Sequence, residues 1–287
     1  MAGVIDDIVG KYNYLMDDLA DPRTDSFPLM HRPFIVALIV IVYLKFCTDY
    51  GPRFMKNRPA YTLKYPIMLY NIFQVVFSIF LVNAGCRYIF SKDYNFICDP
   101  ITDSMDDRVV QTAEHSWWYF FAKITELLDT VFFVFRKKSR QISTLHLFHH
   151  SMVVAVGWVA TKYFPVGPIV VVGTLNSFVH ILMYSYYFVA GLGPEYQKYL
   201  WWKKYLTLIQ IIQFVFVIFH NTLALFQDCN YPKAIHLFVI SNTGLIFYMF
   251  SKFYYNTYIK AKPKKNEDVK TKTVLNARQG KRLSVGQ

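Results

Sequence analysis

Three histidines cluster near the middle of the chain. His146, His149 and His150 stand at positions i, i+3 and i+4 of an apolar stretch, so a helix would place all three on one face. Neutral imidazoles bind transition metals, and they also transfer protons or attack acyl groups. The pattern alone leaves two chemistries open, a metal site and metal-free acid–base or nucleophilic catalysis.

More polar side chains fall inside other apolar stretches, where their burial in hydrocarbon is costly and marks functional sites. These residues are Lys123, Glu126, Asp129, Asn176, His180, Tyr184, Tyr187, Gln210 and Gln213. The step of three from Lys123 to Glu126 to Asp129 favours an ion-paired ridge on one helix. Asn176 and His180 lie one helical turn apart, and Tyr184 and Tyr187 continue that stripe, so these side chains are expected to share a face.

The histidine count argues against the metal site. Membrane di-iron enzymes draw their ligands from several histidine boxes, but this chain has only 8 histidines. Four of them are scattered along the sequence, namely His31, His115, His220 and His236. We therefore expect catalysis without a metal or other cofactor, and a di-iron fatty acyl desaturase or hydroxylase is the alternative.

Composition shows what must position these groups. Hydrophobic residues make up 54% of the 287 residues and charged residues 17%, whereas soluble proteins average about 45–50% and about 25%. The apolar residues come in blocks of roughly 20, the length that crosses a bilayer as a helix. The sequence predicts an all-α, polytopic membrane protein, and it contains no folded basic module of the kind that binds nucleic acid.

Seven apolar blocks are long enough to span the membrane. They cover residues 33–49, 65–88, 114–135, 144–162, 166–190, 204–226 and 234–258. We expect three parts: an acidic N-terminal segment over 1–32, a seven-helix catalytic domain over 33–259 and a basic, unfolded tail over 260–287.

Charge in the loops predicts the orientation. Lysine and arginine concentrate between blocks 1 and 2, 3 and 4, and 5 and 6, and in the tail, which carries nine basic and two acidic residues. Such loops face the cytosol, so the N-terminus is expected in the lumen and the C-terminus in the cytosol. Counted from those ends, the polar groups lie in the cytosolic half of the bilayer, in a chamber open to the cytosol and capped by apolar helix. His220 is the exception, near the lumen.

Two cysteines fall in loops on the predicted lumenal side. Cys98 lies between blocks 2 and 3, and Cys229 between blocks 6 and 7. An oxidising lumen permits a disulfide between them, and a pair of separate thiols is the alternative.

Four ordered motifs give the chain a family resemblance. They are KITELLDTVFFVFRK at 123–137, LHLFHH at 145–150, NSFVHILMYSYY at 176–187 and TLIQIIQF at 207–214. Together they resemble the fatty acid elongases of the endoplasmic reticulum, the very-long-chain 3-oxoacyl-CoA synthases. The likeness extends over about residues 20–260.

The resemblance implies a fold, an activity and partners. Six of the seven helices would ring a narrow acyl tunnel in the endoplasmic reticulum membrane. A long-chain acyl-CoA and malonyl-CoA would condense to a 3-oxoacyl-CoA two carbons longer, CO2 and CoA, without a redox cofactor or metal. Membrane lipid, the reductases and dehydratase of the elongation cycle, and a second copy in a homodimer would be its partners.

Roles follow for the residues already named. His149 is our choice for the group that accepts the acyl chain or acts as base, with His180 opposite it. His146, His150 and Asn176 would stabilise the enolate and oxyanion. The remaining polar residues of the four motifs would orient these groups or line the chamber. Exposed basic residues near the cytosolic mouth would hold CoA phosphates, and they are Arg136, Lys137, Lys138, Arg140, Lys203 and Lys204.

Overall fold

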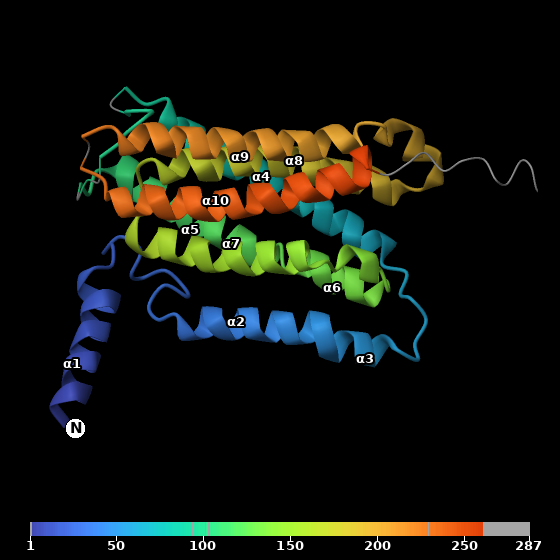
Figure 1. Ribbon diagram of the computed structural model, residues 1–287, viewed down its shortest axis with the longest axis horizontal. Coiled ribbons are helices and arrows are strands. Elements are labelled where there is room, and N and C mark those ends of the chain that lie inside the picture. Colours follow the sequence, from blue (N-terminus) through green and yellow to red (C-terminus); the bar gives the residue numbers. More distant parts are fainter. Residues whose placement is uncertain (1, 93, 101, 103, 229, 261–287) are drawn as a thin grey trace, which may run out of the picture. The chain divides into compact units, whose positions relative to one another are not determined.

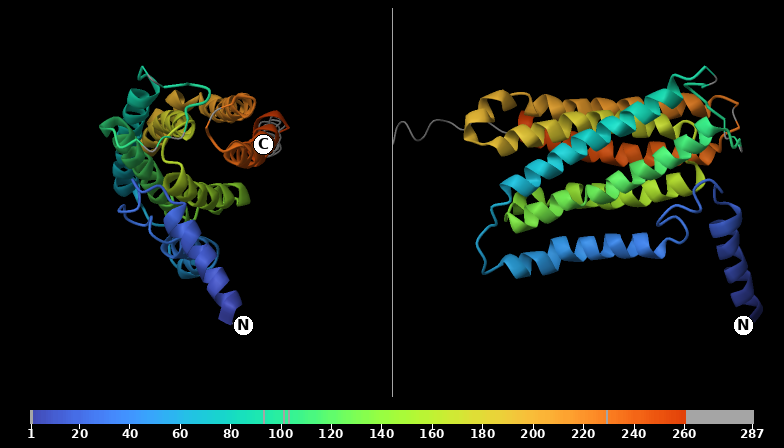
Figure 2. Two further views of the ribbon diagram at one scale, coloured as in Figure 1. Left: turned by 90° about the vertical axis from the view of Figure 1, so that its left-hand side faces the viewer. Right: turned by 180° about the vertical axis from the view of Figure 1, so that it is seen from behind.

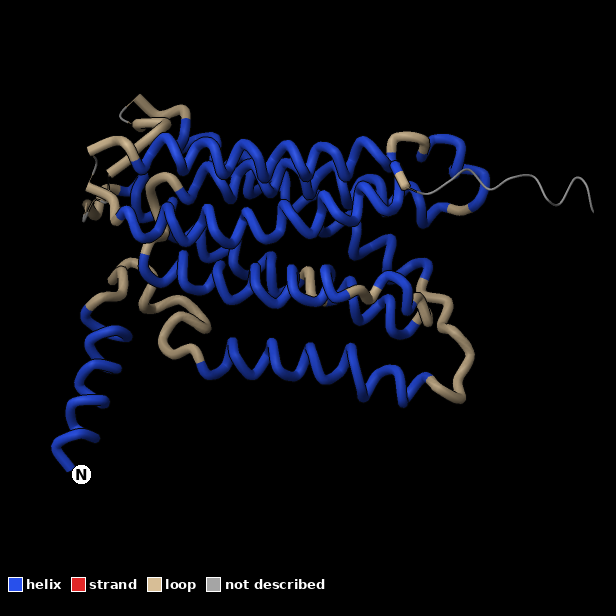
Figure 3. Tube along the Cα trace, viewed as in Figure 1, coloured by secondary structure: helices blue, strands red, loops and turns tan. Residues whose placement is uncertain are grey.

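The computed structural model describes residues 2–92, 94–100, 102, 104–228 and 230–260. The described residues divide into two units, the first ending at Phe250 and the second beginning at Ser251. Every regular element within the described ranges is helical (Figure 3), which confirms the all-α class. The expected domain boundary at residue 260 stays a prediction, because residues 261–287 lie outside the described part of the chain.

The order of the helices follows the predicted apolar blocks. The α-helices are α1 (Ala2–Asn13), α2 (Phe34–Lys45), α3 (Gly51–Met55), α4 (Lys64–Ile89), α5 (Asp107–Thr125), α6 (Leu128–Phe135), α7 (Thr144–Tyr163), α8 (Ile169–Leu192), α9 (Lys203–Leu225) and α10 (Lys233–Tyr254). Short 3-10 or π-helical segments are η1 (Tyr14–Asp18), η2 (Phe46–Tyr50), η3 (Ser139–Gln141), η4 (Pro194–Leu200) and η5 (Tyr255–Ile259).

Helix forms across all seven predicted blocks, but not all seven meet the same criterion for a membrane span. Five helical segments are long and apolar enough among the described residues: Phe34–Met55, Lys64–Ile89, Ile169–Leu192, Lys203–Leu225 and Lys233–Ile259. The two remaining blocks are α5 with α6, and α7, which carry the charged residues and histidines that lower their hydropathy. The count of seven spans therefore stays a prediction.

Six helices of the first unit run alongside one another (Figures 1 and 2). They are α4, α5, α7, α8, α9 and α10, while α2 packs on the outer side of α7. The closest pairing joins α4 to α8. Gly85 makes this approach feasible, because a Cβ atom at that position would overlap the side chain of Thr174.

The loops divide between the two ends of this bundle. Connections that follow α3, α6 and α8 lie at one end, here named the basic end, and those that follow α4, α7 and α9 lie at the opposite end (Figure 1). The charge pattern predicted this grouping, because the basic loops had to share one side of the membrane.

The N-terminal segment is folded onto the opposite end by side chains that bond its backbone. Trp158 Nε1 donates to the Leu29 carbonyl at 2.8 Å, and Lys162 Nζ donates to the Met30 carbonyl at 3.0 Å. Trp117 Nε1 binds the Pro28 carbonyl at 2.8 Å. The segment therefore closes this end of α5 and α7, which its acidic composition alone did not indicate.

Replacing Trp158 by Phe should destabilise the protein by about 1–3 kcal/mol, because the Leu29 carbonyl would lose its donor in a buried setting. Thermal unfolding of the purified protein in detergent would measure the loss. Trp201→Phe is the control, since Trp201 is 74% exposed. Equal melting temperatures for the two variants would contradict this role.

Candidate active site

The three clustered histidines begin helix α7 at the basic end. Ser143 caps that helix by accepting a hydrogen bond from the His146 backbone N–H at 3.2 Å. The ring centres of His146 and His150 lie 4.3 Å apart, and those of His149 and His150 lie 5.4 Å apart. The predicted shared face is therefore confirmed.

His146 belongs to a chain of hydrogen bonds across three helices. Its Nε2 lies 2.8 Å from Thr130 Oγ1 on α6, and Thr130 Oγ1 lies 2.8 Å from Tyr43 OH on α2. Thr130 and Tyr43 are fully or almost fully buried. These two residues hold the His146 ring in place. Thr130 lies in the motif at 123–137, but we predicted no chemical role for it, and nothing in the sequence singled out Tyr43.

A buried ion cluster joins α5 to α8. Lys123 Nζ lies 2.7 Å from Glu126 Oε1, and His180 Nδ1 lies 2.9 Å from the same oxygen. Lys123 also donates to Asn176 Oδ1 at 2.8 Å. The exposed fractions are 2% for Lys123, 2% for Glu126 and 5% for His180. Charges this deep are stable only when paired, so the cluster fixes the positions of His180 and Asn176.

The expected ion-paired ridge stops at Glu126. Helix α5 ends at Thr125 and α6 begins at Leu128, with i to i+3 backbone bonds across the turn. This tightened turn redirects Asp129, whose Oδ2 accepts a hydrogen bond from Tyr184 OH at 2.7 Å. Asp129 is therefore tied to α8 rather than to Lys123.

Tyr184 continues the stripe of Asn176 and His180 along α8, as predicted. Its ring centre lies 5.8 Å from that of His180. Tyr70 OH lies 3.4 Å from Tyr184 OH, and Gln74 donates to Tyr70 OH at 3.0 Å. Tyr70 and Gln74 are buried on α4, outside the four motifs, and the sequence analysis missed both.

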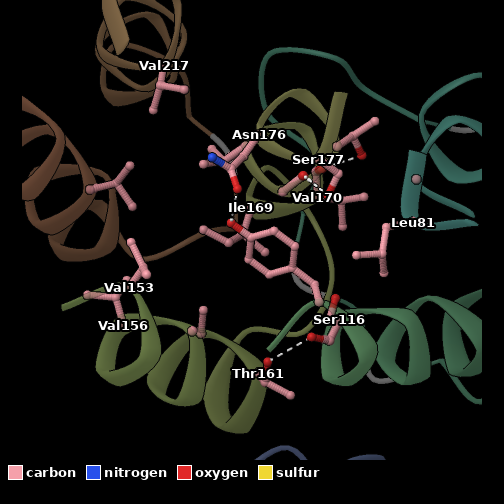
Figure 4. Close-up of a pocket in the computed structure, with 18 of the residues that line it drawn as sticks. Leu81, Ser116, Val153, Val156, Thr161, Ile169, Val170, Asn176, Ser177 and Val217 are labelled. Carbon is pink, nitrogen blue, oxygen red and sulfur yellow. Dashed lines mark hydrogen bonds between the residues drawn. The ribbon is translucent and has the colours of Figure 1, made fainter. Parts of the chain in front are cut away.

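A pocket extends from these polar groups into the bundle (Figure 4). Its lining comes from α4, α5, α7, α8, α9 and α10. His149, Asn176 and Gln213 line the part of it nearer the basic end, whereas Gln210 bonds Met183 Sδ at 3.7 Å and Tyr187 is 38% exposed. Along α7 the lining continues from His149 to Thr161, which is about 18 Å of helix.

Half of the remaining lining is valine, isoleucine, alanine and glycine, but it is not the purely apolar cap we expected. Hydroxyl residues line its far part, including Ser116 and Thr161. Thr161 Oγ1 donates to the Ser116 carbonyl at 3.1 Å, and Ser116 Oγ to the Pro165 carbonyl at 2.5 Å (Figure 4 shows the first of these). Because the backbone takes their hydrogens, these side chains present mainly carbon and oxygen lone pairs to the cavity.

The remaining predicted residues lie apart from this site. All six basic residues proposed for CoA are exposed at the basic end, in the α6–α7 connection or the first turn of α9. His220 Nε2 lies 2.6 Å from the Phe96 carbonyl at the opposite end, as expected. Cys98 is buried and disulfide-bonded. Cys229 lies outside the described residues, so its pairing with Cys98 stays a prediction.

Within the described ranges, no three His, Cys, Asp or Glu side chains converge as ligands for a metal ion. His146 lies beside Thr130, and His180 lies beside Glu126. The described residues therefore show no ligand set for the di-iron alternative.

The described helical bundle has five segments long and apolar enough to cross a membrane, and a buried ionic cluster lies beside its internal pocket. This is the architecture of a multi-pass membrane protein. The model of the ELO family, described as GNS1/SUR4, matches residues 28–266. The chain therefore belongs to the ELO family.

Curated relatives agree with this assignment. Very long chain fatty acid elongase 7 of Drosophila melanogaster is 42% identical over 257 residues, covering 89% of this chain and 78% of that protein. Very long chain fatty acid elongase 4 of Homo sapiens is 37% identical over 267 residues, covering 93% and 84%. Elongase 7 of Rattus norvegicus is 38% identical over 250 residues, covering 86% and 88%.

Proposed function

We propose that this protein is a fatty acid elongase of the acyltransferase class. It condenses a long-chain acyl-CoA with malonyl-CoA and forms a 3-oxoacyl-CoA two carbons longer, CO2 and free CoA. The observation that carries the proposal is a single pocket that places His149 and Asn176 at the head of a long, mostly apolar lining. The relatives' names support fatty acid elongation as the reaction.

The first step transfers the acyl group. His149 attacks the thioester carbon, and the acyl–imidazole bond forms as the acyl–sulfur bond breaks and CoA leaves. Asn176 is held by Lys123 and Tyr119, at 2.8 and 3.1 Å. Its amide N–H group is therefore free to donate toward the oxygen that becomes negative.

The second step forms the carbon–carbon bond. Malonyl-CoA loses CO2, and the resulting carbanion equivalent attacks the acyl carbon while the bond to His149 breaks. His180 lies against Glu126, which orients its ring and balances positive charge on it. His146 and His150 complete the polar surface beside His149. No metal or redox cofactor takes part in this scheme, so activity should not change when metals are chelated.

The basic end supplies a surface for the CoA groups, because its six exposed lysines and arginines carry positive charge and can donate hydrogen bonds to phosphate oxygens. The same assignment places the basic end in the cytosol and the opposite end in the lumen of the endoplasmic reticulum. Seven membrane spans, a six-helix acyl tunnel, a homodimer, and partner reductases and a dehydratase are parts of this proposal.

The test is an extension assay in microsomes that express the chain. Labelled malonyl-CoA would be supplied with a series of acyl-CoAs of increasing length, with and without a chelator. We expect malonyl-dependent addition of two carbons that is insensitive to chelation. Failure to extend any acyl-CoA, or activity that requires a metal, would overturn the proposal.

The pocket also predicts how chain length is controlled. Val156 lines it about 10 Å from His149 along α7. Val156→Trp should reduce extension of the longest acyl-CoAs by about 5- to 150-fold, since overpacking costs about 1–3 kcal/mol. Val159→Trp is the matched control on the same helix, because Val159 is 37% exposed and outside the pocket. Unchanged product lengths for Val156→Trp would mean that the acyl chain lies elsewhere.

A further inference from the structure

A second cavity lies between α4 and α5 at the opposite end of the bundle, away from the α7 histidines. Its polar lining includes Asn83 and Arg87 from α4, and Arg108, Gln111 and His115 from α5. None of the described residues that line it carries a carboxylate. Two guanidinium groups, two amides and an imidazole offer hydrogen-bond donors, a set that suits an oxyanion such as phosphate.

The cavity has fixed walls. Arg108 donates to Ser91 Oγ, and its guanidinium lies 5.6 Å from the ring centre of Tyr88. The neighbouring carboxylate of Glu114 is outside the lining and accepts a hydrogen bond from Trp118 Nε1 at 3.3 Å. Arg87 and Gln111 are exposed, so a ligand can reach them from outside the bundle.

Aromatic side chains lead from this cavity along the outer side of α4 and α5. The ring centres of Phe80 and His115 lie 5.4 Å apart, those of Phe80 and Trp118 6.5 Å, and those of Phe77 and Trp118 6.1 Å. Phe73 continues the row, 5.4 Å from Phe77. We name these four residues of α4 and α5, Phe73, Phe77, Phe80 and Trp118, the aromatic row. The distance along α4 from Arg87, in the cavity, to Phe73, at the far end of the aromatic row, is about 21 Å.

The two features together match a lipid rather than a free anion. Helix α4 is one of the five segments long and apolar enough to cross a membrane. Arg87 comes two residues before its end, at the level of headgroups, and the aromatic row runs from there toward the middle of the helix. Phe73 and Phe80 are 46% and 42% exposed, so their rings are open to a ligand.

We propose that this cavity binds the phosphate of one membrane phospholipid, whose acyl chain lies against the aromatic row. Arg87 holds the phosphate oxygens, and Asn83 and Gln111 add amide donors. The site adjoins the pocket of the histidines, because Ala84, Thr112 and His115 line both cavities. These residues of α4 and α5 form the wall between the two cavities. The lipid would therefore lie against the outer face of this wall, beside the far part of the pocket.

The test measures lipid retention by the full-length protein in detergent, using native mass spectrometry. The probes are dioleoyl phosphatidylglycerol, dioleoylglycerol and inorganic phosphate. Wild type should retain one phosphatidylglycerol per chain, and Arg87→Gln should weaken this retention at least tenfold. Lys92→Gln is the matched control, since it removes an exposed positive charge near the same end without touching the cavity.

Gln111→Leu is a second variant at an exposed position, and it should weaken retention in the same direction. Equal retention of dioleoylglycerol would overturn the proposal, as would undiminished binding in both variants. If inorganic phosphate displaced the lipid at comparable concentration, the cavity would be a site for free anions, and the lipid assignment would be wrong.

Discussion

His149→Ala should lower malonyl-dependent extension by about 10²–10⁴-fold, the range that a single acid–base or nucleophilic group contributes. His149 is the only one of the three α7 histidines in the lining of the pocket. The ring of His146 is held by Thr130 Oγ1 at 2.8 Å from its Nε2. The ring of His149 instead packs near an aromatic side chain, and its ring centre lies 5.9 Å from that of Phe250. The substitution should therefore remove chemistry while leaving the fold intact.

A single-turnover experiment would separate the nucleophile from the base. Wild type incubated with labelled acyl-CoA alone should release CoA and become labelled, whereas His149→Ala should not. His31→Ala is the control, because His31 is exposed and outside the pocket. If His149→Ala kept most of its turnover, or was labelled like wild type, the acyl group would be carried by another residue.

The helical spacing of the motif residues was enough to predict much of this site. The step from His146 to His149 and His150 fixed a shared face, and Asn176 with His180 and Tyr184 formed the predicted stripe. Period and helix geometry determine such relations within one element. The pairing of Lys123 with Glu126 could also be predicted, because Glu126 is the C-cap of the helix that carries Lys123, three residues further on.

Side-chain contacts between different helices could not be predicted from spacing in this way. The support of His146 by Thr130 and Tyr43 needs three helices to meet, and no spacing within one helix contains that information. Asp129 illustrates a second limit. Its step of three predicted a place on the ion-paired ridge with Lys123 and Glu126, but the tightened turn between α5 and α6 directs it to Tyr184. A local change of helix type overrides the ideal periodicity.

The N-terminal segment shows a third limit. Its composition predicted only an acidic segment before the first span, yet Trp117, Trp158 and Lys162 bind its carbonyl groups. Side chains far along the chain donate hydrogen bonds to backbone carbonyls of this segment. The segment's own sequence does not indicate that it is ordered. The α4–α5 cavity was missed for a related reason, since Arg87 and Arg108 looked like ordinary charges in flanking positions.

Lys123→Met should destabilise the protein by about 3–5 kcal/mol, the cost of leaving one member of a buried ion pair without its partner. Glu126 is 2% exposed, and its Oε1 would keep only the contact with His180. Thermal unfolding in detergent would measure the loss. Lys138→Met is the control, because Lys138 is an exposed lysine at the basic end.

The double variant Lys123→Met/Glu126→Leu tests whether the ion pair only stabilises the fold or also positions His180 and Asn176. Replacing both charges by apolar groups of similar size should restore most of the stability, because no buried charge remains unpaired. Activity should stay low, since His180 would lose its neighbour at 2.9 Å and Asn176 its donor at 2.8 Å. We expect kcat to fall while KM for the acyl-CoA changes little, because the pocket beyond the polar end is unaltered. A double variant that regained both stability and turnover would show that the ion pair only holds α5 together, and that His180 and Asn176 are positioned by packing.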